Sequence, residues 1–447
     1  MKKRIVSLLF AALFMALCLI PSAGTAVFGP SAAGANEVLS PKPALTDRDG
    51  RFNSNVLADA AAWLGDHFWL RQELVTGWAK LNAALFRTSA AEDVILGREG
   101  WLYFAPTLGD YTASETMTER ELWCAARTLY LLQEHVRSLG GEFVFTVAPN
   151  KNSLYPGAMP ELPKSDAAAN AEALPALLSE MGVNYLDLFS LFREQEEILY
   201  FPTDSHWNGK GAALAADGLL SALGREGGYF ASEFRPGQHK GDLYEMLYPA
   251  GKAADPDWVY APGFTFEGGG SNPDAITIRT QSAAGAGSLV MYRDSFGRNL
   301  YPYLAERFEN AVFSRKTDYG AVEPAEGDTV IVELVERNLS YLNLYSPSVP
   351  GAVRSAGLVS GAAAAGSLPL SASEEGNLLS LEGEFGLLRP DSDSPVYVMC
   401  AGTLFEAVPR PEGFRLCLDK DTDLADVTVY FTAEGNLTAL EGVIEYK

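Results

Sequence analysis

Residues 288–308 read SLVMYRDSFGRNLYPYLAERF, and this stretch decides the fold. Residues 289–292 form a short apolar run that is typical of a buried strand, and apolar residues recur at helical spacing from 299 to 308. The turn between them places Ser295 at the end of a sheet, with N–H groups of the following helix available to a developing oxyanion. The alternative is an ordinary turn or N-cap serine, since Asp-Ser dipeptides recur elsewhere in the chain.

The second informative stretch is YFPTDSHWNGKG at residues 200–211. Asp204 and His206 stand two apart, so on an extended strand or strand end both side chains would leave the same face. A carboxylate beside an imidazole fixes the tautomer and orientation of the ring. Trp207 could wall such a site, and Asn208 is a plausible N-cap for a helix that follows from residue 211.

The Asp-x-His spacing alone is weak evidence, because the chain has 57 acidic residues and only 4 histidines. The alternative is a surface aspartate next to a packed histidine. His67 lies in a Trp-rich helical stretch, His135 on a helix and His239 in a polar loop, so none of them suggests another site. With Ser295, the pair completes a nucleophile, a general base and an orienting acid.

Taken together, T-D-x-H-W followed by D-S-F resembles the SGNH-hydrolase-like proteins of bacterial polysaccharide O-acetylation, namely the alginate acetylation proteins and the related DHHW family. The resemblance covers residues 52–345. Four further blocks fit the same family: DVILGREGWLYF at 93–104, VAPNKNSLYPGAMP at 147–160, GDLYEML at 241–247 and VIVELVERNL at 330–339. One departure is Arg293, which stands where the plain pattern has glycine and puts the tightness of the turn in question.

The resemblance implies an acetyl-serine on Ser295, a polysaccharide acceptor and a membrane-bound acyltransferase that supplies the acetyl groups. It implies no cofactor and no metal, and no Cys-x-x-Cys motif or His/Cys cluster suggests one. Lys151 and Arg337 are candidates for substrate or oxyanion contacts, and each could equally form a structural ion pair. The other substrate-binding candidates in these blocks are Trp207, Tyr155 and Asn338.

Strands and helices alternate from residue 142 to residue 334, a pattern that predicts a parallel sheet flanked by helices. In such sheets the site lies at the carboxyl ends of the strands. We therefore expect an α/β, SGNH-like catalytic domain over residues 52–345. Residues 227–278, rich in Gly, Pro and aromatics, form an insertion that could overhang the site.

Residues 1–35 begin with three basic residues, continue with an apolar run and end in small residues, as in a secretory signal peptide. Cleavage after Ala26 or Ala35 and retention as an anchor are both open. Loss of the three positive charges would move the net charge from −23 to −26. Such an acidic chain is a poor partner for nucleic acid or anionic lipid. We expect an extracytoplasmic protein, either secreted, periplasmic or anchored at the cell surface.

Residues 36–51 and 346–368 read as linkers. Beyond them, four short strand-like runs separated by turns predict a small all-β domain over 369–447, expected to be a β-sandwich. This domain could bind glycans, as implied by resemblance to the tail of an alginate acetylation protein, or serve only for packing. Cys400 and Cys417 lie in separate runs and could pair, whereas Cys124 suits a buried thiol.

Three functions remain open from the sequence. The first is an exported O-acetyltransferase that acts on a cell-surface or secreted polysaccharide. The second is a carbohydrate esterase with the same triad. The third is a non-catalytic glycan-binding or assembly protein, which the Arg293 departure keeps in consideration.

Overall fold

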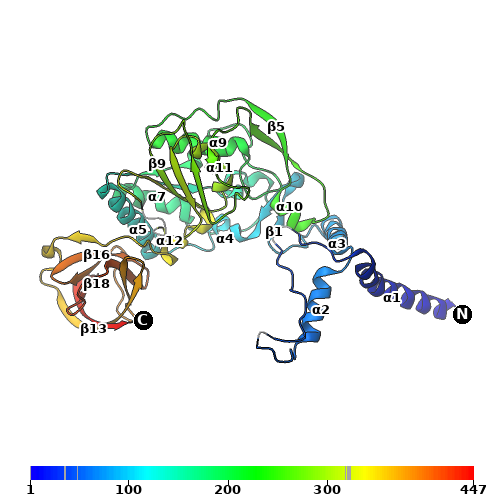
Figure 1. The fold of residues 1–447 in the computed structure, drawn as a ribbon, viewed down its shortest axis with the longest axis horizontal. Helices are drawn as coiled ribbons and strands as arrows, with labels where there is room; N and C mark the ends of the chain where they lie inside the picture. The colour runs from blue at the N-terminus through cyan, green and yellow to red at the C-terminus, as the bar shows by residue number, and fades with distance from the viewer. Residues whose placement is uncertain (1, 35–36, 48, 318, 320–323, 447) are drawn as a thin grey trace.

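The computed structural model describes residues 2–34, 37–47, 49–317, 319 and 324–446. A central body of strands and helices carries a small barrel at one end and the N-terminal helices at the other (Figure 1).

The central body is built on a seven-stranded sheet with the order β4-β3-β11-β9-β10-β8-β7. Strands β4, β3, β11, β9 and β10 run parallel, whereas β8 and β7 extend the sheet antiparallel at one edge. Their bounds are β3 (Glu142–Ala148), β4 (Tyr185–Leu186), β7 (Glu267–Gly268), β8 (Thr277–Gln281), β9 (Ser288–Tyr292), β10 (Asn310–Ser314) and β11 (Thr329–Val335). The mostly parallel SGNH-like sheet expected from the sequence is confirmed.

Helices cover both faces of this sheet (Figure 1). One apolar cluster joins the sheet to α8, α9 and α11, and a second joins it to α5, α7 and α12. Every residue of the central strand β11 is buried, as expected when both faces are covered. The helix bounds are α5 (Glu119–Ser138), α7 (Asn170–Met181), α8 (Leu188–Arg193), α9 (Gly209–Ala222), α11 (Gly297–Ala305) and α12 (Tyr341–Leu344).

The insertion at 227–278 folds into a two-stranded ribbon, β5 (Phe234–His239) with β6 (Asp255–Tyr260), and the short helix α10 (Asp242–Leu247) between them. The ribbon passes close to the start of α9. A Cβ on Gly209 would lie 1.9 Å from the carbonyl oxygen of Trp258, so only glycine fits there. The insertion is therefore packed against the segment that carries Asp204 and His206.

The C-terminal domain is a closed barrel of seven strands rather than the expected sandwich. Its order is β16-β15-β18-β19-β13-β14-β17, and β17 pairs back with β16, while β12 adds to β16 from outside. The bounds are β12 (Ala352–Arg354), β13 (Ala363–Glu375), β14 (Leu378–Glu384), β15 (Val396–Cys400), β16 (Thr403–Pro409), β17 (Gly413–Asp419), β18 (Thr428–Ala433) and β19 (Asn436–Tyr446). The expected linker at 346–368 therefore already contains β12 and the start of β13.

The barrel is attached to α5 through ion pairs around Glu406, whose side chain is 0 % exposed. Arg127 on α5 lies 2.6 Å from Glu406, and Arg354 on β12 lies 2.7 Å from the same carboxylate. Arg354 also reaches Glu134 on α5, at 2.5 Å. Because both carboxylates share one guanidinium, the barrel and the central body are held in a defined orientation.

The N-terminal region holds α1 (Lys2–Phe28), α2 (Val56–His67) and α3 (Arg71–Phe86), followed by the pair β1 (Val94–Leu96) and β2 (Leu102–Phe104). Helix α1 is long and apolar enough to cross a membrane, a test that signal sequences also pass. The second cleavage candidate, Ala35, lies outside the described residues. Cys124, Cys400 and Cys417 are buried free thiols, so the pairing of Cys400 with Cys417 is not formed.

Candidate functional site

Three adjacent parallel strands end at the same edge of the sheet, and each is followed by one of the sequence-predicted segments. Strand β3 leads into Lys151, β11 into Arg337 and Asn338, and β9 into Ser295. This edge is the carboxyl edge, where ligands bind in open α/β sheets. These segments therefore follow the edge of the sheet at which the sequence predicts the site.

Asp204 and His206 lie in a turn rather than on an extended strand. They occupy a tight loop closed by an isolated bridge between Tyr200 and Trp207, immediately before α9. The side chain of Asn208 caps α9 by accepting from the N–H groups of Lys210 and Gly211, as predicted. What turns the two site residues toward each other is the turn itself, because Oδ1 of Asp204 accepts the backbone N–H of His206 at 2.9 Å.

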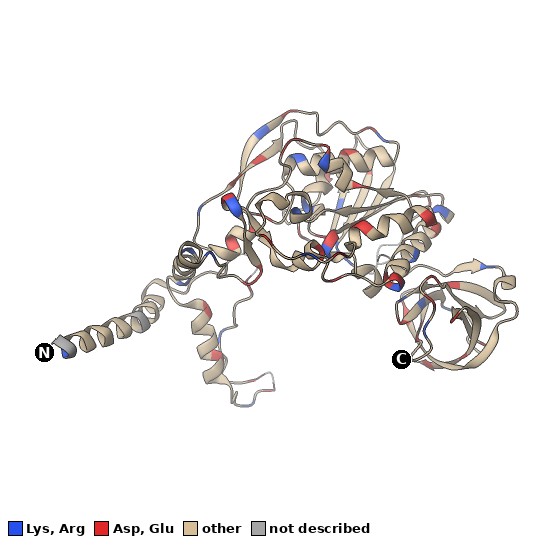
Figure 2. Ribbon diagram, turned by 180° about the vertical axis from the view of Figure 1, so that it is seen from behind, with Lys and Arg blue, Asp and Glu red and all other residues tan. Residues whose placement is uncertain are grey.

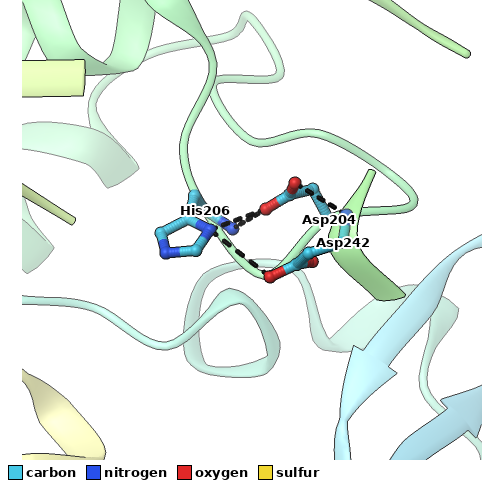
Figure 3. A group of neighbouring side chains, drawn as sticks. All are labelled: Asp204, His206 and Asp242. Atoms are coloured by element: carbon cyan, nitrogen blue, oxygen red, sulfur yellow. Dashed lines mark hydrogen bonds and ion pairs between the residues drawn. The ribbon is translucent and has the colours of Figure 1, made fainter. Parts of the chain in front are cut away.

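The imidazole of His206 is held in one orientation. Its Nδ1 lies 2.7 Å from Oδ1 of Asp204, and both side chains are buried. Figure 3 shows the ring with Nδ1 toward the carboxylates and Nε2 directed away from them. Nε2 is buried and has no hydrogen-bond partner among the described residues. With the proton on Nδ1, the lone pair of Nε2 is free to accept a proton, as a general base requires.

Ser295 lies half-buried on the turn between β9 and α11, as the sequence predicts. The following ring, Phe296, packs against the imidazole of His206 with ring centroids 4.8 Å apart. No hydrogen bond joins Ser295 to His206, since Nε2 has no partner. The preceding Asp294 shapes the turn by accepting from the backbone N–H groups of Phe296 and Val335. The turn that carries Ser295 thus packs against the imidazole through Phe296, without a hydrogen bond from Ser295 to Nε2.

His239, set aside in the sequence analysis, is part of the site. Its Nε2 lies 2.7 Å from Oδ2 of Asp204, the oxygen that His206 does not use. Burial alone would raise the pKa of Asp204, but the charges and hydrogen bonds of His206 and His239 outweigh it and hold the pKa well below its usual range. Burial lowers the pKa of His239, and the hydrogen bond and charge of Asp204 more than reverse this, so its pKa is raised overall.

Asp242, from the GDLYEML block, completes the surroundings of the imidazole (Figure 3). Its Oδ2 lies 3.6 Å from Nδ1 of His206 and accepts the hydroxyl of Ser205 at 2.7 Å. Burial and the charge of Asp204 raise the pKa of Asp242. The only signal in the sequence was the family block itself, because nothing local to residue 242 or 239 indicates contact with residue 204.

Asp204, His206 and Asp242 offer ligand atoms within 4.8 Å of one another, a spacing that one metal ion could use. Hydrogen bonds already account for this group. Oδ1 of Asp204 accepts from His206, and Oδ2 accepts from His239 and from the backbone N–H of Asp242 at 2.9 Å. The donors present are those expected around a carboxylate that orients an imidazole.

Lys151 is buried beneath the Asp204 loop and is not positioned as a free substrate contact. Its ammonium group donates to the carbonyl oxygens of Phe201, Pro202 and Asp204 at 3.0, 2.9 and 2.5 Å. These three bonds use all three donors of the side chain. Burial lowers the pKa of Lys151 to about 7, although the charges of nearby carboxylates raise it. The residue holds the loop in shape.

Trp207 and Tyr155 also support the loop rather than line an opening. Trp207 is 0 % exposed and packs between Phe192 and Phe296, so a substrate cannot reach it. The hydroxyl of Tyr155 accepts the backbone N–H of Leu199 at 2.9 Å. The expectation that Trp207 walls the site is therefore wrong, because its indole fills the core behind the site.

Arg337 and Asn338 lie half-buried in the loop after β11. Asn338 donates to Oδ2 of Asp294 at 3.2 Å and so steadies the serine turn. The guanidinium of Arg337 lies over the rings of Phe104 and Phe296, at 5.3 and 5.7 Å from their centroids. Its Nη1 donates to Oδ1 of Asn150 at 3.4 Å, and no carboxylate among the described residues lies within ion-pair distance of its guanidinium.

Arg293 does not obstruct the serine turn. Its guanidinium donates to the carbonyl oxygens of Asp294, Pro273 and Ala275, at 3.3, 2.7 and 3.3 Å. A Cβ at Gly297 would lie 2.5 Å from the Arg293 side chain, so the glycine of this motif makes room for the arginine. The departure from the family pattern is compensated within the turn.

Comparisons with known proteins show which families this chain resembles. Residues 94–261 match the family model described as "SGNH hydrolase-like domain, acetyltransferase AlgX". The resemblance inferred from the sequence is confirmed. The matched residues include Asp204, His206, His239 and Asp242 of the SGNH-like domain, and they end before Ser295.

A probable alginate O-acetylase AlgJ of Pseudomonas syringae pv. tomato is 26 % identical over 195 residues, which cover 41 % of this chain. The chain spans about half the length of the curated relatives it matches, 48 % in this case. Bacillus cereus PatB1 with a sulfonyl adduct shares 16 % identity and a TM-score of 0.43, over 56 % of this chain and 99 % of that structure. A DHHW family protein from Eubacterium siraeum shares 16 % identity and a TM-score of 0.39, over 50 % and 90 %.

Proposed function

We propose that this protein is an exported O-acetyltransferase that transfers acetyl groups to a cell-surface or secreted polysaccharide. The observation that carries the proposal is the buried, unpartnered Nε2 of His206, on a ring whose other nitrogen is fixed by Asp204, beside the turn that bears Ser295. This arrangement suits a base that takes the proton of a serine hydroxyl.

In this proposal the Ser295 Oγ attacks the acetyl carbonyl, and its proton passes to Nε2 of His206. The donor's leaving group departs with that proton, and an acetyl-serine remains. A sugar hydroxyl then attacks the ester and gives its proton to Nε2, the acetyl group passes to the sugar oxygen, and Ser295 Oγ leaves with the proton that Nε2 returns. Asp204 keeps the imidazole in the required tautomer and stabilises its charged form. Arg337 is the candidate contact for an anionic group of the donor or the glycan.

The polysaccharide acceptor and a membrane-bound acyltransferase that supplies acetyl groups are part of the same proposal. Two facts support the acceptor: the match to a family described as acetyltransferase AlgX, and curated relatives described as probable alginate O-acetylases. Glycan binding by the barrel also remains a proposal. Compensation of Arg293 by Gly297 removes the reason that the sequence gave for a degenerate site.

Mass spectrometry after incubation with an activated acetyl ester tests the proposal. We expect one acetyl group on Ser295 in the wild type and none at that position in Ser295→Ala. Ser392→Ala is the matched control, because Ser392 also follows an aspartate but lies exposed in the barrel. A glycan acceptor should then remove the label from Ser295 faster than water does. Unchanged acetyl transfer by Ser295→Ala would refute the assignment, and release of acetate regardless of acceptor would identify an esterase.

A further inference from the structure

Helix α3 exposes an apolar stripe along one side. Its members recur every three or four residues and therefore share one helical face. They are Leu74, Trp78, Leu81 and Leu85, which are 48, 61, 47 and 65 % exposed. We call this set the α3 stripe. Single exposed apolar residues are common on proteins, whereas a row of four large ones marks an interaction surface.

The opposite side of α3 is fixed to the body, so the stripe cannot turn inward. Ala79 is buried in a cluster with Leu243 and Leu247 of α10. The hydroxyl of Thr76 accepts the backbone N–H of Ala250 at 2.9 Å. The helix therefore packs through its small residues and presents its large apolar residues outward, the reverse of what burial in this chain alone would favour.

The C-terminal end of α1 is attached where α3 begins (Figure 1). Thr25 Oγ1 accepts the backbone N–H of Trp69 at 2.8 Å, and the ring of Phe28 stacks on Trp69 with centroids 4.9 Å apart. A Cβ on Gly24 would lie 2.3 Å from the same indole, so the contact is close. Trp69 precedes the first residue of α3, Arg71, by two positions.

Helix α1 meets the length and polarity of a membrane crossing. The span Arg4–Phe28 has 25 residues and contains an 18-residue window with a mean hydropathy of 2.5, whereas a bilayer core needs about 20 apolar residues. Its only charged residues lie in its first turn, and the rest of the helix is uncharged (Figure 2). If α1 crosses a bilayer, its contact with Trp69 places the start of α3 at the surface of that bilayer.

We propose that the α3 stripe inserts into the lipid–water interface of the membrane that α1 enters, so that the bilayer surface is its partner. Trp78 suits this depth, since tryptophan concentrates at membrane interfaces, and an amphipathic helix binds there through its apolar face. The chain carries a net charge of −23, so attraction to anionic lipid does not drive the contact. Insertion should therefore occur equally well in vesicles of neutral lipid.

Site-directed spin labelling of the full chain tests this directly. Cys18→Ser removes the one cysteine of α1, and Cys124, Cys400 and Cys417 are buried. A nitroxide at Leu81→Cys, in phosphatidylcholine vesicles, should collide more with oxygen than with a water-soluble nickel chelate. Leu387→Cys is the matched control, because Leu387 is fully exposed in the barrel, and its label should show the opposite preference.

A second variant separates the stripe from the anchor. The combined change L74S/W78S/L81S/L85S keeps α1, and it should leave thermal unfolding nearly unchanged because all four positions are exposed. A label at Phe86→Cys, next to the stripe, should lose its lipid protection in this background. Equal nickel access at Leu81 and Leu387 would overturn the proposal. Protection of Leu81 in native membranes but not in lipid vesicles would also overturn it and indicate a protein partner.

Discussion

Nε2 of His239 lies 2.7 Å from Oδ2 of Asp204, so the insertion supplies a second imidazole to the carboxylate that orients the base. A hydrogen bond to a charged group contributes about 1.5–3 kcal/mol. Under the proposed function, His239 is therefore a positioning residue, one that acts through Asp204 rather than on a substrate.

We expect His239→Leu to lower kcat by about tenfold to a hundredfold, in line with the loss of one charge-assisted hydrogen bond. His239→Gln, which keeps a donor, should recover much of the loss. Asp204→Asn should cost far more, on the order of ten-thousandfold by the serine-protease precedent. Acetyl loading of Ser295 measured over time checks all three variants, and a His239→Leu rate equal to the wild type would show that the contact is only structural.

Loss of the Lys151 ammonium should destabilise the protein as well as the site. Lys151→Met leaves three buried carbonyl oxygens without their donor, and we expect a loss of about 3 kcal/mol or more in the free energy of unfolding. Denaturant unfolding measures this. The control is Lys252→Met, because Lys252 is exposed, and it should change the free energy by less than about 0.5 kcal/mol.

The buried carboxyl group of Glu336 should make the free energy of unfolding depend on pH. Burial raises its pKa from an ordinary value of 4.5 to about 7, although hydrogen bonds from Asn150 and Ser153 oppose this. The folded protein then binds the proton more tightly than the unfolded chain, so this contribution is complete below pH 4.5 and is lost as the pH rises through 7. We expect unfolding free energy to fall by about 1 kcal/mol per pH unit between these values from this group.

Glu336→Gln should flatten that pH dependence, since it removes the titrating group. The matched control is Glu180→Gln, an exposed residue of α7 that is not among the charges acting on Glu336, and it should leave the slope unchanged. Unfolding in urea at pH 5, 6, 7 and 8 gives the comparison. Identical slopes in the wild type and Glu336→Gln would contradict the assignment.

The sequence predicted the parts of this fold that depend on local pattern. The strand, turn and helix around Ser295 follow from apolar periodicity, and the cap of α9 follows from Asn208. It could not show that His239 and Asp242 reach Asp204, because those contacts depend on how a 52-residue insertion folds back. For the same reason, closure of the barrel by the pairing of β16 with β17 was not visible, since short alternating strands suit a sandwich equally well.

The burial of two site candidates, Trp207 and Lys151, could not be predicted from the sequence either. Trp207 and Lys151 stand in blocks that resemble substrate-binding motifs, but their side chains point into the core and the loop backbone. A residue's type and position in a motif do not fix the direction of its side chain when the motif forms a turn.

The junction between the barrel and α5 gives a further prediction. Glu406→Gln leaves Arg127 and Arg354 without the carboxylate they share, and breaking a buried ion pair in this way costs about 3–5 kcal/mol. Glu412→Gln is the control, because the Glu412–Arg389 pair is exposed on both sides and should contribute at most about 1 kcal/mol. Unfolding of the two variants should differ clearly, and equal stability would show that the barrel is held by other contacts.

The carboxylate of Asp204 binds His206 and also contacts His239 and Asp242, which lie 35 and 38 positions after Asp204 in the chain. If His206 acts as the proposed general base, it can be oriented fully only after the insertion has folded onto its loop. A new chain whose insertion is still unfolded would then carry the serine without its working base. Under the proposed function, such a chain could not hydrolyse the acetyl donor prematurely, and catalytic competence would report complete folding of the domain.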